Sequence, residues 1–336
     1  MDIRASYMGI ELKNPIIIGA CNLVDKPENL LKLQEAGASA IVYRSLFEEQ
    51  LHLENLEFGN IMQEYNERSS EVGSMHSDFR HAGPKEYILK LMNAKKILEI
   101  PLFASLNAVY DKSWIDYAKK IEDAGVDGIE LNLYTLPSQL DSANSTVVDW
   151  QIDILKKIRE AVKIPLAVKL SPYYSNPMDI IRKMDYAGAD AFVLFNRFFQ
   201  PDIDLEKEEL IFPYNLSNEN DYRLSMRFAG LLHKNIDANI CSSNGIFSGF
   251  DVAKMILAGA DVVQIVSTIY KNGFGQISLI LSQLQSFMDS KGYNKIDDFK
   301  GKLSKANIND PFAYNRAQYI DILMNSNDIF KKYPMI

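Results

Sequence analysis

A repeated four-residue pattern constrains the fold of this chain more than any other feature of its sequence. The pattern is Ala-Gly, a small apolar residue, then Ser or Asp, and it occurs at 36–39, 124–127, 187–190 and 258–261. An apolar run follows each copy directly, in turn AIVYRS, GIELNLY, AFVLFNR and VVQIVST. A glycine just past a helix end takes the left-handed conformation that stops the helix, and a short turn then leads into a strand. Each copy therefore predicts a helix, a turn and a strand in that order.

Four further apolar runs complete a set of eight expected strands. Two begin with Ile-Pro-Leu, at 100–102 and 164–166, where proline suits the first residue of a strand. The other two cover 15–20 and 238–245, and helical patterns such as 149–162 separate most of the runs. Eight β–α units with almost continuously apolar strands predict an α/β fold, a parallel (β/α)8 TIM barrel. The alternative, a doubly wound open sheet, requires fewer strands and a topological switch.

We interpret residues 1–336 as a single domain with additions to the bare repeat. Residues 1–14 predict an N-terminal hairpin at the barrel floor, and 290–336 form a C-terminal tail. Long insertions at 46–84 and 199–219 follow the second and sixth expected strands, on the face where barrel active sites lie. These insertions would serve either as lids or as oligomer contacts.

The composition is that of an ordinary globular protein, 47% hydrophobic and 24% charged, with a net charge of −8 and a pI near 5.2. This acidic balance argues against a nucleic-acid partner and against anionic membranes. The N-terminus lacks the layout of a signal peptide, and no apolar run reaches the roughly 18 residues of a membrane helix. Cys21 and Cys241 make no disulfide framework, so we expect reduced thiols and a cytoplasmic location.

Alternation along the expected strands directs polar side chains into the barrel. In the run 166–171, Lys169 shares the inward face with Ala167 and Ser171. The same count directs these residues inward: Arg44, Ser105, Asn107, Glu130, Asn132 and Asn196. Buried polar groups without partners cost a few kcal/mol each, so the whole set predicts a polar ligand between the strand ends. The alternative for Lys169 and Glu130 is a structural ion pair.

Small hydroxyl residues follow the last two expected strands, at 242–245 (SSNG) and 267–268 (ST). Loops at these places commonly bind phosphate in barrels, although an ordinary polar turn is the alternative. A phosphate here and an inward Lys169 would suit FMN, with the lysine stabilising the negative charge of the reduced ring. We assign no metal ligands.

The sequence resembles the dihydroorotate dehydrogenases, the FMN-dependent barrels of pyrimidine biosynthesis, and among them the soluble class 1 enzymes. The resemblance covers nearly the whole chain, and it is the order and spacing of its motifs that make it specific. The motifs are Asn14-Pro15, Gly19-Ala20-Cys21, Glu130-Leu131-Asn132-Leu133, Val168-Lys169-Leu170-Ser171-Pro172, Asn196, Asn244-Gly245-Ile246, Val263-Gln264-Ile265, and a tail from Gly292-Tyr293 to Asp298-Phe299-Lys300-Gly301-Lys302-Leu303.

The resemblance implies the residues of the site. The expected flavin-binding residues are Ala20, Cys21, Arg44, Ser45, Asn107, Asn132, Lys169, Asn196, Ser243, Asn244, Gly245, Ser267 and Thr268. The expected substrate-binding residues are His81, Asn107, Asn132 and Asn196. The family further implies a homodimer, and it leaves open the electron acceptor and an electron-transfer partner.

The sequence departs from the family in the loop that holds the catalytic base. Class 1 enzymes carry Ser-Cys-Pro-Asn there, with the cysteine as base, and class 2 enzymes use a serine, whereas this chain has YTLPS at 134–138. The candidate bases are therefore Thr135 and Ser138, hydroxyls that need a relay water or a neighbouring base. Cys21 is either a substitute thiol or a small buried residue. Three other positions differ: Arg44 replaces a lysine, and Asn244 and Val266 replace glycines.

We expect an FMN-dependent oxidoreductase of the dihydroorotate dehydrogenase type, acting on a CH–CH group of a small-molecule substrate. Hydride would leave C6 of (S)-dihydroorotate for flavin N5 while Thr135 or Ser138 takes the C5 proton. Lys169, an expected catalytic residue, would stabilise the reduced flavin. The chain starts directly at the barrel without a helical extension, which disfavours the membrane-bound, quinone-using class.

Three other functions remain open from the sequence. An FMN-dependent ene-reductase or dihydropyrimidine-type enzyme would explain the altered loop 134–138. A barrel that binds flavin or phosphate without turnover is the second, and a lyase that forms a Schiff base on Lys169 is the third. Transfer-RNA dihydrouridine synthesis is disfavoured by the acidic charge. An absorption spectrum of the purified protein separates the flavoproteins from the lyase.

Overall fold

Eight parallel strands close into a barrel in a computed structural model that describes residues 1–48, 82–108, 110–133, 144–197, 200–213 and 215–314, with 320, 323 and 324. The order around the barrel is β11-β12-β3-β4-β5-β6-β7-β8. The strands are β3 (Ile16–Ile18), β4 (Ala40–Phe47), β5 (Leu102–Asn107), β6 (Gly128–Asn132), β7 (Leu166–Leu170), β8 (Ala191–Leu194), β11 (Asn239–Ser243) and β12 (Val262–Ile265). All eight expected strands are present, and the predicted (β/α)8 fold is confirmed.

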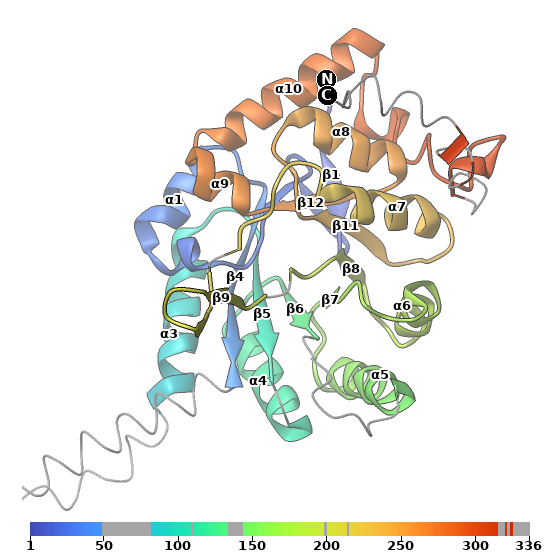
Figure 1. Cartoon of the computed structure of the whole chain (residues 1–336). Coiled ribbons are helices and arrows are strands. Elements are labelled where there is room, and N and C mark those ends of the chain that lie inside the picture. The colour runs from blue at the N-terminus through green and yellow to red at the C-terminus, as the bar shows by residue number, and fades with distance from the viewer. Residues whose placement is uncertain are drawn as a thin grey trace, which may run out of the picture.

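Helices surround these strands on the outside of the barrel (Figure 1). They are α1 (Pro27–Glu35), α3 (Ala82–Ile97), α4 (Asp111–Asp123), α5 (Asn144–Ala161), α6 (Pro177–Tyr186), α7 (Tyr222–Leu232), α8 (Gly249–Ala258), α9 (Ser267–Asn272) and α10 (Gln276–Lys291). Short 3₁₀ helices are η1 (Asn22–Asp25), η3 (Ile296–Asp298) and η4 (Pro311–Tyr314). Among the helices of the described residues, none has both the length and the apolar character that a bilayer crossing requires.

The glycines of the four-residue repeat stop four helices as expected. Gly37, Gly125, Gly188 and Gly259 follow α1, α4, α6 and α8, with φ angles of 112°, 79°, 98° and 127°. A side chain is strained at such angles, so glycine is the residue that allows the chain to turn into the next strand.

The strand faces also follow the predicted alternation. Leu166, Val168 and Leu170 pack in the large apolar cluster between strands and helices, whereas Ala167 belongs to a second cluster inside the barrel. An antiparallel hairpin of β1 (Ala5–Tyr7) and β2 (Ile10–Leu12) contributes Tyr7, Met8 and Leu12 to that second cluster. The hairpin therefore closes the barrel floor with apolar side chains, which leaves the polar inward residues to the opposite end.

The two insertions are partly described. β4 extends to Phe47 and α3 begins at Ala82, so the expected excursion is shorter at both ends, and residues 49–81 lie outside the described part. The second insertion contains an antiparallel hairpin of β9 (Asp202–Asp204) and β10 (Glu209–Ile211). Both insertions follow strand ends on the active-site face.

Candidate active site

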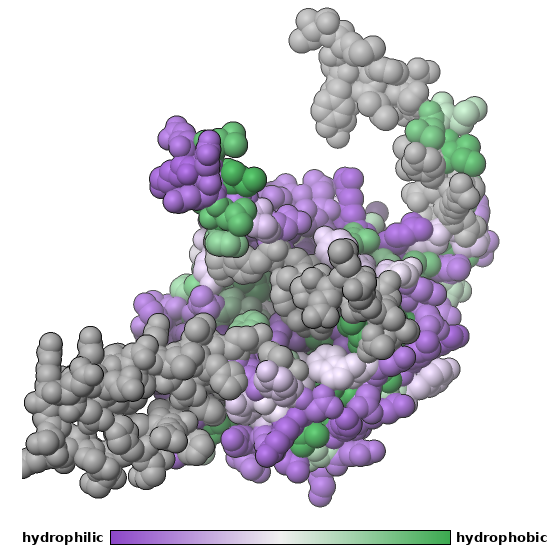
Figure 2. Space-filling model, turned by 60° about the horizontal axis from the view of Figure 1, so that its bottom comes forward, coloured by the Kyte–Doolittle hydropathy of each residue, from purple (hydrophilic) through white to green (hydrophobic). Residues whose placement is uncertain are grey.

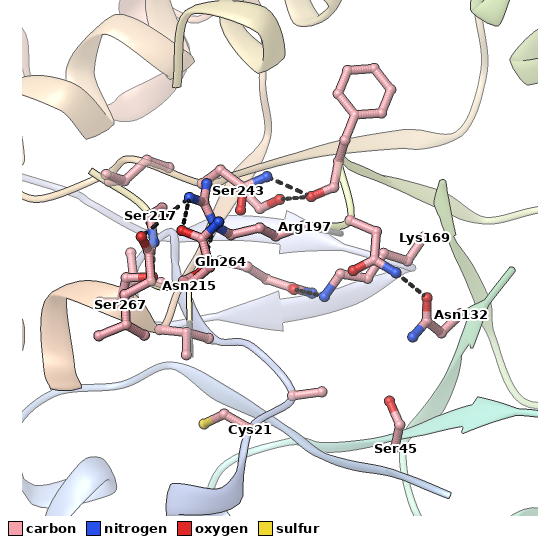
Figure 3. Close-up of a pocket in the computed structure, with 18 of the residues that line it drawn as sticks. Cys21, Ser45, Asn132, Lys169, Arg197, Asn215, Ser217, Ser243, Gln264 and Ser267 are labelled. Atoms are coloured by element: carbon pink, nitrogen blue, oxygen red, sulfur yellow. Dashed lines mark hydrogen bonds between the residues drawn. The ribbon is translucent and has the colours of Figure 1, made fainter. Parts of the chain in front are cut away.

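A cavity of about 650 Å³ opens at the carboxyl ends of the barrel strands, where active sites of this fold lie. Figure 3 shows part of its wall, with Ser217 and Ser267 at one end and Lys169 and Asn132 toward the other. Of the residues expected from the sequence, the wall contains Ala20, Cys21, Arg44, Ser45, Asn132, Lys169, Asn196, Ser243, Asn244, Gly245 and Ser267. These residues lie at or after the ends of different strands, so it is closure of the barrel that brings them together.

Lys169 belongs to a polar cluster of the barrel interior. Its Nζ lies 3.4 Å from Oε1 of Glu130 on β6 and 3.5 Å from Oε1 of Gln264 on β12. Nε2 of Gln264 donates to Oε2 of Glu130 at 2.6 Å, and the Glu130 side chain is only 2% exposed. The ion pair that the sequence left open is thus present. Because the ammonium has three donors, Lys169 can hold Glu130 and still act on a ligand in the cavity that it lines.

Two asparagines are joined across the mouth of the barrel. Nδ2 of Asn196 donates to Oδ1 of Asn132 at 2.7 Å, and the backbone N–H of Asn196 donates to the Leu170 carbonyl at 2.7 Å. Asn132 ends β6 and Asn196 follows β8, so the bridge passes over β7 between them. The two amides therefore restrict each other's orientation at the cavity wall.

The turn after β11 has a left-handed backbone at two successive residues. The φ angles are 69° for Asn244 and 65° for Gly245. Asparagine is one of the few side chains that tolerate such an angle, and Nδ2 of Asn244 also donates to the Phe195 carbonyl at 2.8 Å. A Cβ on Gly245 would lie 2.5 Å from the backbone nitrogen of Tyr222, so this position requires glycine. Asn244 therefore keeps the backbone shape that a glycine would have.

The cavity wall also contains residues 215–217, which lie beside this turn and were not among the site residues expected from the sequence. The Ser217 N–H donates to Oγ of Ser267 at 2.9 Å, and the Gly245 N–H donates to Oγ of Ser217 at 3.1 Å. Arg197, also missed, binds this segment with its guanidinium. No local sequence pattern predicts these contacts, because they depend on how the insertion folds back over the barrel.

Gln264 was missed for a different reason. Val262 and Gln264 are two residues apart on β12, so their side chains lie on the same face of the strand. Val262 belongs to the cluster inside the barrel, and Gln264 therefore also points inward. The same counting that assigned Glu130 would have found it.

Arg44 and Ser45 on β4 both have protein partners near the cavity. Nε of Arg44 lies 2.6 Å from Oδ1 of Asp25 in η1. Oγ of Ser45 shares a hydrogen bond of 2.7 Å with Oγ of Ser105. The Asp25 carboxylate balances the charge of Arg44, whereas Lys169 belongs to the interior cluster itself.

Cys21 lies in the cavity wall, but its thiol is protected from ionisation. Burial raises the pKa of the Cys21 thiol to about 11. The thiolate is the reactive and basic form of cysteine, so at neutral pH this group keeps its proton. The structure thus favours a small buried residue over a substitute base at this position.

The remaining expected residues lie elsewhere. Asn107 at the end of β5 and Thr268 in α9 are buried but do not belong to the cavity wall. Oγ1 of Thr268 accepts a hydrogen bond from Asn272 at 3.3 Å. Thr135, Ser138 and His81 lie outside the described residues, so their roles stay predictions.

Comparison with known proteins gives consistent matches along the chain. A family model described as "Dihydroorotate dehydrogenase" matches residues 3–288. The catalytic subunit of dihydroorotate dehydrogenase B (NAD(+)) from Thermoplasma volcanium is 28% identical over 305 residues, 89% of this chain and 98% of that protein. The corresponding subunit from Methanocaldococcus jannaschii is 24% identical, with 85% and 93% covered. Dihydroorotate dehydrogenase (fumarate) from Saccharomyces mikatae is 29% identical, with 70% and 80% covered.

Proposed function

Because the chain belongs to the dihydroorotate dehydrogenase family, we propose that it oxidises (S)-dihydroorotate to orotate at this cavity with FMN as its cofactor. One observation carries the proposal to the site itself. Among the described residues the cavity wall contains three cationic side chains, Arg44, Lys169 and Arg197, and no carboxylate. Asp25, Glu130 and Asp221 pair with these cations, but none of the three carboxylates belongs to the wall. Dihydroorotate and the FMN phosphate are both anions, and a wall that presents cations and no carboxylate favours them.

The residues present fit FMN. A cavity of about 650 Å³ lies within the range for cofactor sites. Beside it, Nδ2 of Asn107 is buried and has no hydrogen-bond partner among the described residues, which supports a polar ligand at the end of β5. Lys169, Asn132 and Asn196 would hold the ring, and the backbone of the turn at 243–245 together with the Ser267 hydroxyl would hold the phosphate.

When bound, FMN supplies the acceptor for the substrate hydride. Lys169 would place its positive charge beside the pyrimidine edge of the ring, where negative charge develops, and the Glu130 carboxylate keeps the ammonium in place. Asn132 and Asn196, hydrogen-bonded to each other, would orient the substrate by their remaining donors and acceptors.

The proton on C5 of the substrate needs a base. Thr135 and Ser138 remain our candidates, and either hydroxyl would need a relay water or a neighbouring base to take the proton. Cys21 is a poor candidate because burial raises the pKa of its thiol to about 11.

Anaerobic reduction of the purified protein by dihydroorotate tests the proposal. We expect a flavin absorption spectrum that bleaches on addition of dihydroorotate, and turnover with fumarate, NAD or a quinone then identifies the electron acceptor. A colourless protein that takes up no FMN would contradict both the cofactor and the reaction.

The altered loop 134–138 favours one second candidate, an FMN-dependent ene-reductase or dihydropyrimidine-type oxidoreductase with a different substrate. The same experiment separates the two. Bleaching by NADH but not by dihydroorotate would select the second candidate.

We further propose a homodimer, as in the family resemblance, with the β9–β10 hairpin in the interface. Ile203, Leu205, Leu210 and Phe212 on and beside this hairpin are 57%, 85%, 64% and 70% exposed. In Figure 2 a segment projects from the surface at the upper left, with hydrophobic residues gathered on one of its sides. Light scattering of the wild type and of Leu205→Glu tests this: we expect a dimer for the first and a monomer for the second. A monomeric wild type would refute it.

A further inference from the structure

Arg197 in the cavity wall binds one neighbouring segment, residues 215–221, with all three of its guanidinium nitrogens. Nε donates to the Asn215 carbonyl at 2.7 Å, and Nη2 donates to Oδ1 of Asn215 at 2.8 Å and to the Leu216 carbonyl at 3.2 Å. Nη1 donates to Oδ2 of Asp221 at 2.8 Å. The planar guanidinium thus ties the start of segment 215–221 to its end, a geometry that only a rigid fork of donors allows.

The segment that Arg197 holds brings Ser217 to the end of the cavity where we expect the phosphate to bind. The Ser217 carbonyl accepts from Nζ of Lys271 at 2.9 Å, and the Ser217 N–H donates to Ser267 as described above. Ser217 is buried, with 3% of its surface exposed. Lys271 and Ser267 thus hold Ser217 directly, and Arg197 holds Asn215 and Leu216 immediately before it in the chain.

The hydrogen-bond directions at the two serines favour an anion. Oγ of Ser217 accepts from the Gly245 N–H, and Oγ of Ser267 accepts from the Ser217 N–H. In the described part of the chain, no carbonyl or carboxylate accepts a hydrogen bond from either hydroxyl. Each hydroxyl therefore has its own hydrogen to donate into the cavity that both residues line, where a phosphate oxygen would accept it.

We propose that Arg197 is a positioning residue for phosphate recognition: it clamps residues 215–217 so that the Ser217 hydroxyl faces the phosphate of the flavin. This inference rests on the proposed FMN function. Arg197 acts through Ser217 and not as a direct ligand, because four of its five N–H donors are occupied by protein acceptors and Asp221 balances its charge. The clamp should matter for FMN and not for riboflavin, which has the same ring and lacks the phosphate.

Binding of FMN and riboflavin to the apoprotein, followed by quenching of flavin fluorescence, tests the clamp. For Arg197→Met we expect the preference for FMN over riboflavin to fall about tenfold, while the riboflavin Kd stays within about twofold. Arg197→Lys keeps the charge but loses the fork, and we expect a similar fall. Arg182→Met is the matched control, because Arg182 is exposed on α6 and its guanidinium bonds Asp179, outside segment 215–221.

A double-mutant cycle with Ser217→Ala tests the route of the effect. If Arg197 acts through Ser217, the double variant loses no more FMN preference than the larger of the two single variants. Additive losses, an unchanged preference in Arg197→Met, or full retention by Arg197→Lys would each overturn the clamp. These results differ from failure of the proposed function, in which the wild-type protein itself would bind no FMN.

Discussion

Lys169 and Glu130 show how one residue can have a structural and a chemical role together. The carboxylate is almost fully buried between β6 and the barrel axis, and its partners are Lys169 at 3.4 Å and Gln264 at 2.6 Å. An unpaired buried charge is costly, so the ammonium is held in place by electrostatics as well as by packing. The same ammonium lines the cavity. Substitution of Lys169 therefore removes both roles, and the two have to be separated experimentally.

Lys169→Met should lower the rate of flavin reduction by dihydroorotate about a hundredfold or more, because the developing negative charge loses its nearest cation. The variant should also lose about 3 kcal/mol of stability, since Glu130 is left without its cation. Stopped-flow absorbance and urea unfolding measure the two effects. In Lys169→Met with Glu130→Gln, stability should recover and the rate should not. Recovery of the rate would refute the chemical role.

Cys21→Ala should leave the pH profile of flavin reduction unchanged between about pH 6 and 9. Burial raises the pKa of the thiol to about 11, so only about one molecule in a thousand carries a thiolate at pH 8. The profile measured for both proteins under the same conditions decides the matter. Loss of an alkaline limb in the variant would instead identify Cys21 as the base.

At the scale of the elements, the aspartate that ends three of the four copies of the repeat fastens a strand to its neighbour. Oδ2 of Asp127, Asp190 and Asp261 accepts from the backbone N–H of Leu102, Leu166 and Ile240, at 2.8, 2.8 and 2.7 Å. Each carboxylate also pairs with a cation, from Lys95, Arg159 and Lys300 in turn. These aspartates thus provide an acceptor for a backbone N–H at the start of the preceding strand.

Asp261→Ala should destabilise the protein by about 2 kcal/mol, because it leaves the Ile240 N–H at the strand start without its acceptor. Asp261→Asn keeps an acceptor and should cost less. Asp237→Ala, at an exposed aspartate nearby, should change stability by less than about 0.5 kcal/mol. Equilibrium unfolding in urea compares the three, and equal losses for Asp261→Ala and Asp237→Ala would contradict this role of the repeat.

At the scale of the whole molecule, apolar and polar groups occupy opposite ends of the barrel. The floor is filled by Tyr7, Met8 and Leu12 of the hairpin together with inward residues such as Phe103 and Val193. The other end holds the cavity and its cations. Stability and ligand binding are thus placed on different faces, which is the usual division in this fold. Burial throughout the core also affects how stability depends on pH.

The free energy of unfolding should fall as pH rises from about 9 to 12. Burial raises the pKa of Cys21 from 9.0 to about 11 and that of Tyr43 and Tyr174 from 10.0 to about 12. Because these groups lose their protons first in the unfolded chain, rising pH stabilises the unfolded state. Tyr43→Phe should flatten the decline measured by urea unfolding, and Tyr186→Phe, at an 81% exposed ring, should not. Identical slopes in all three proteins would contradict the assignment.

Much of the site was predictable because it depends on strand order and alternation. Inward counting found Lys169, Glu130 and Asn132, and the same rule covers Gln264, which was overlooked. Asn107 obeys the rule as well but lies beside the cavity, because alternation gives the face of a side chain and not its distance from the strand end.

The sequence by itself determined the eight strands, the helix stops at the repeat glycines and the polar lining of the barrel. These features follow from contacts within a strand or a turn, where spacing alone sets geometry. Only the tertiary structure decided that Arg197 grips residues 18 and 24 positions further along the chain and brings Ser217 to Gly245 and Ser267. Such contacts form when an insertion folds back over a closed barrel, and the local periodicity of the chain does not predict how the insertion folds.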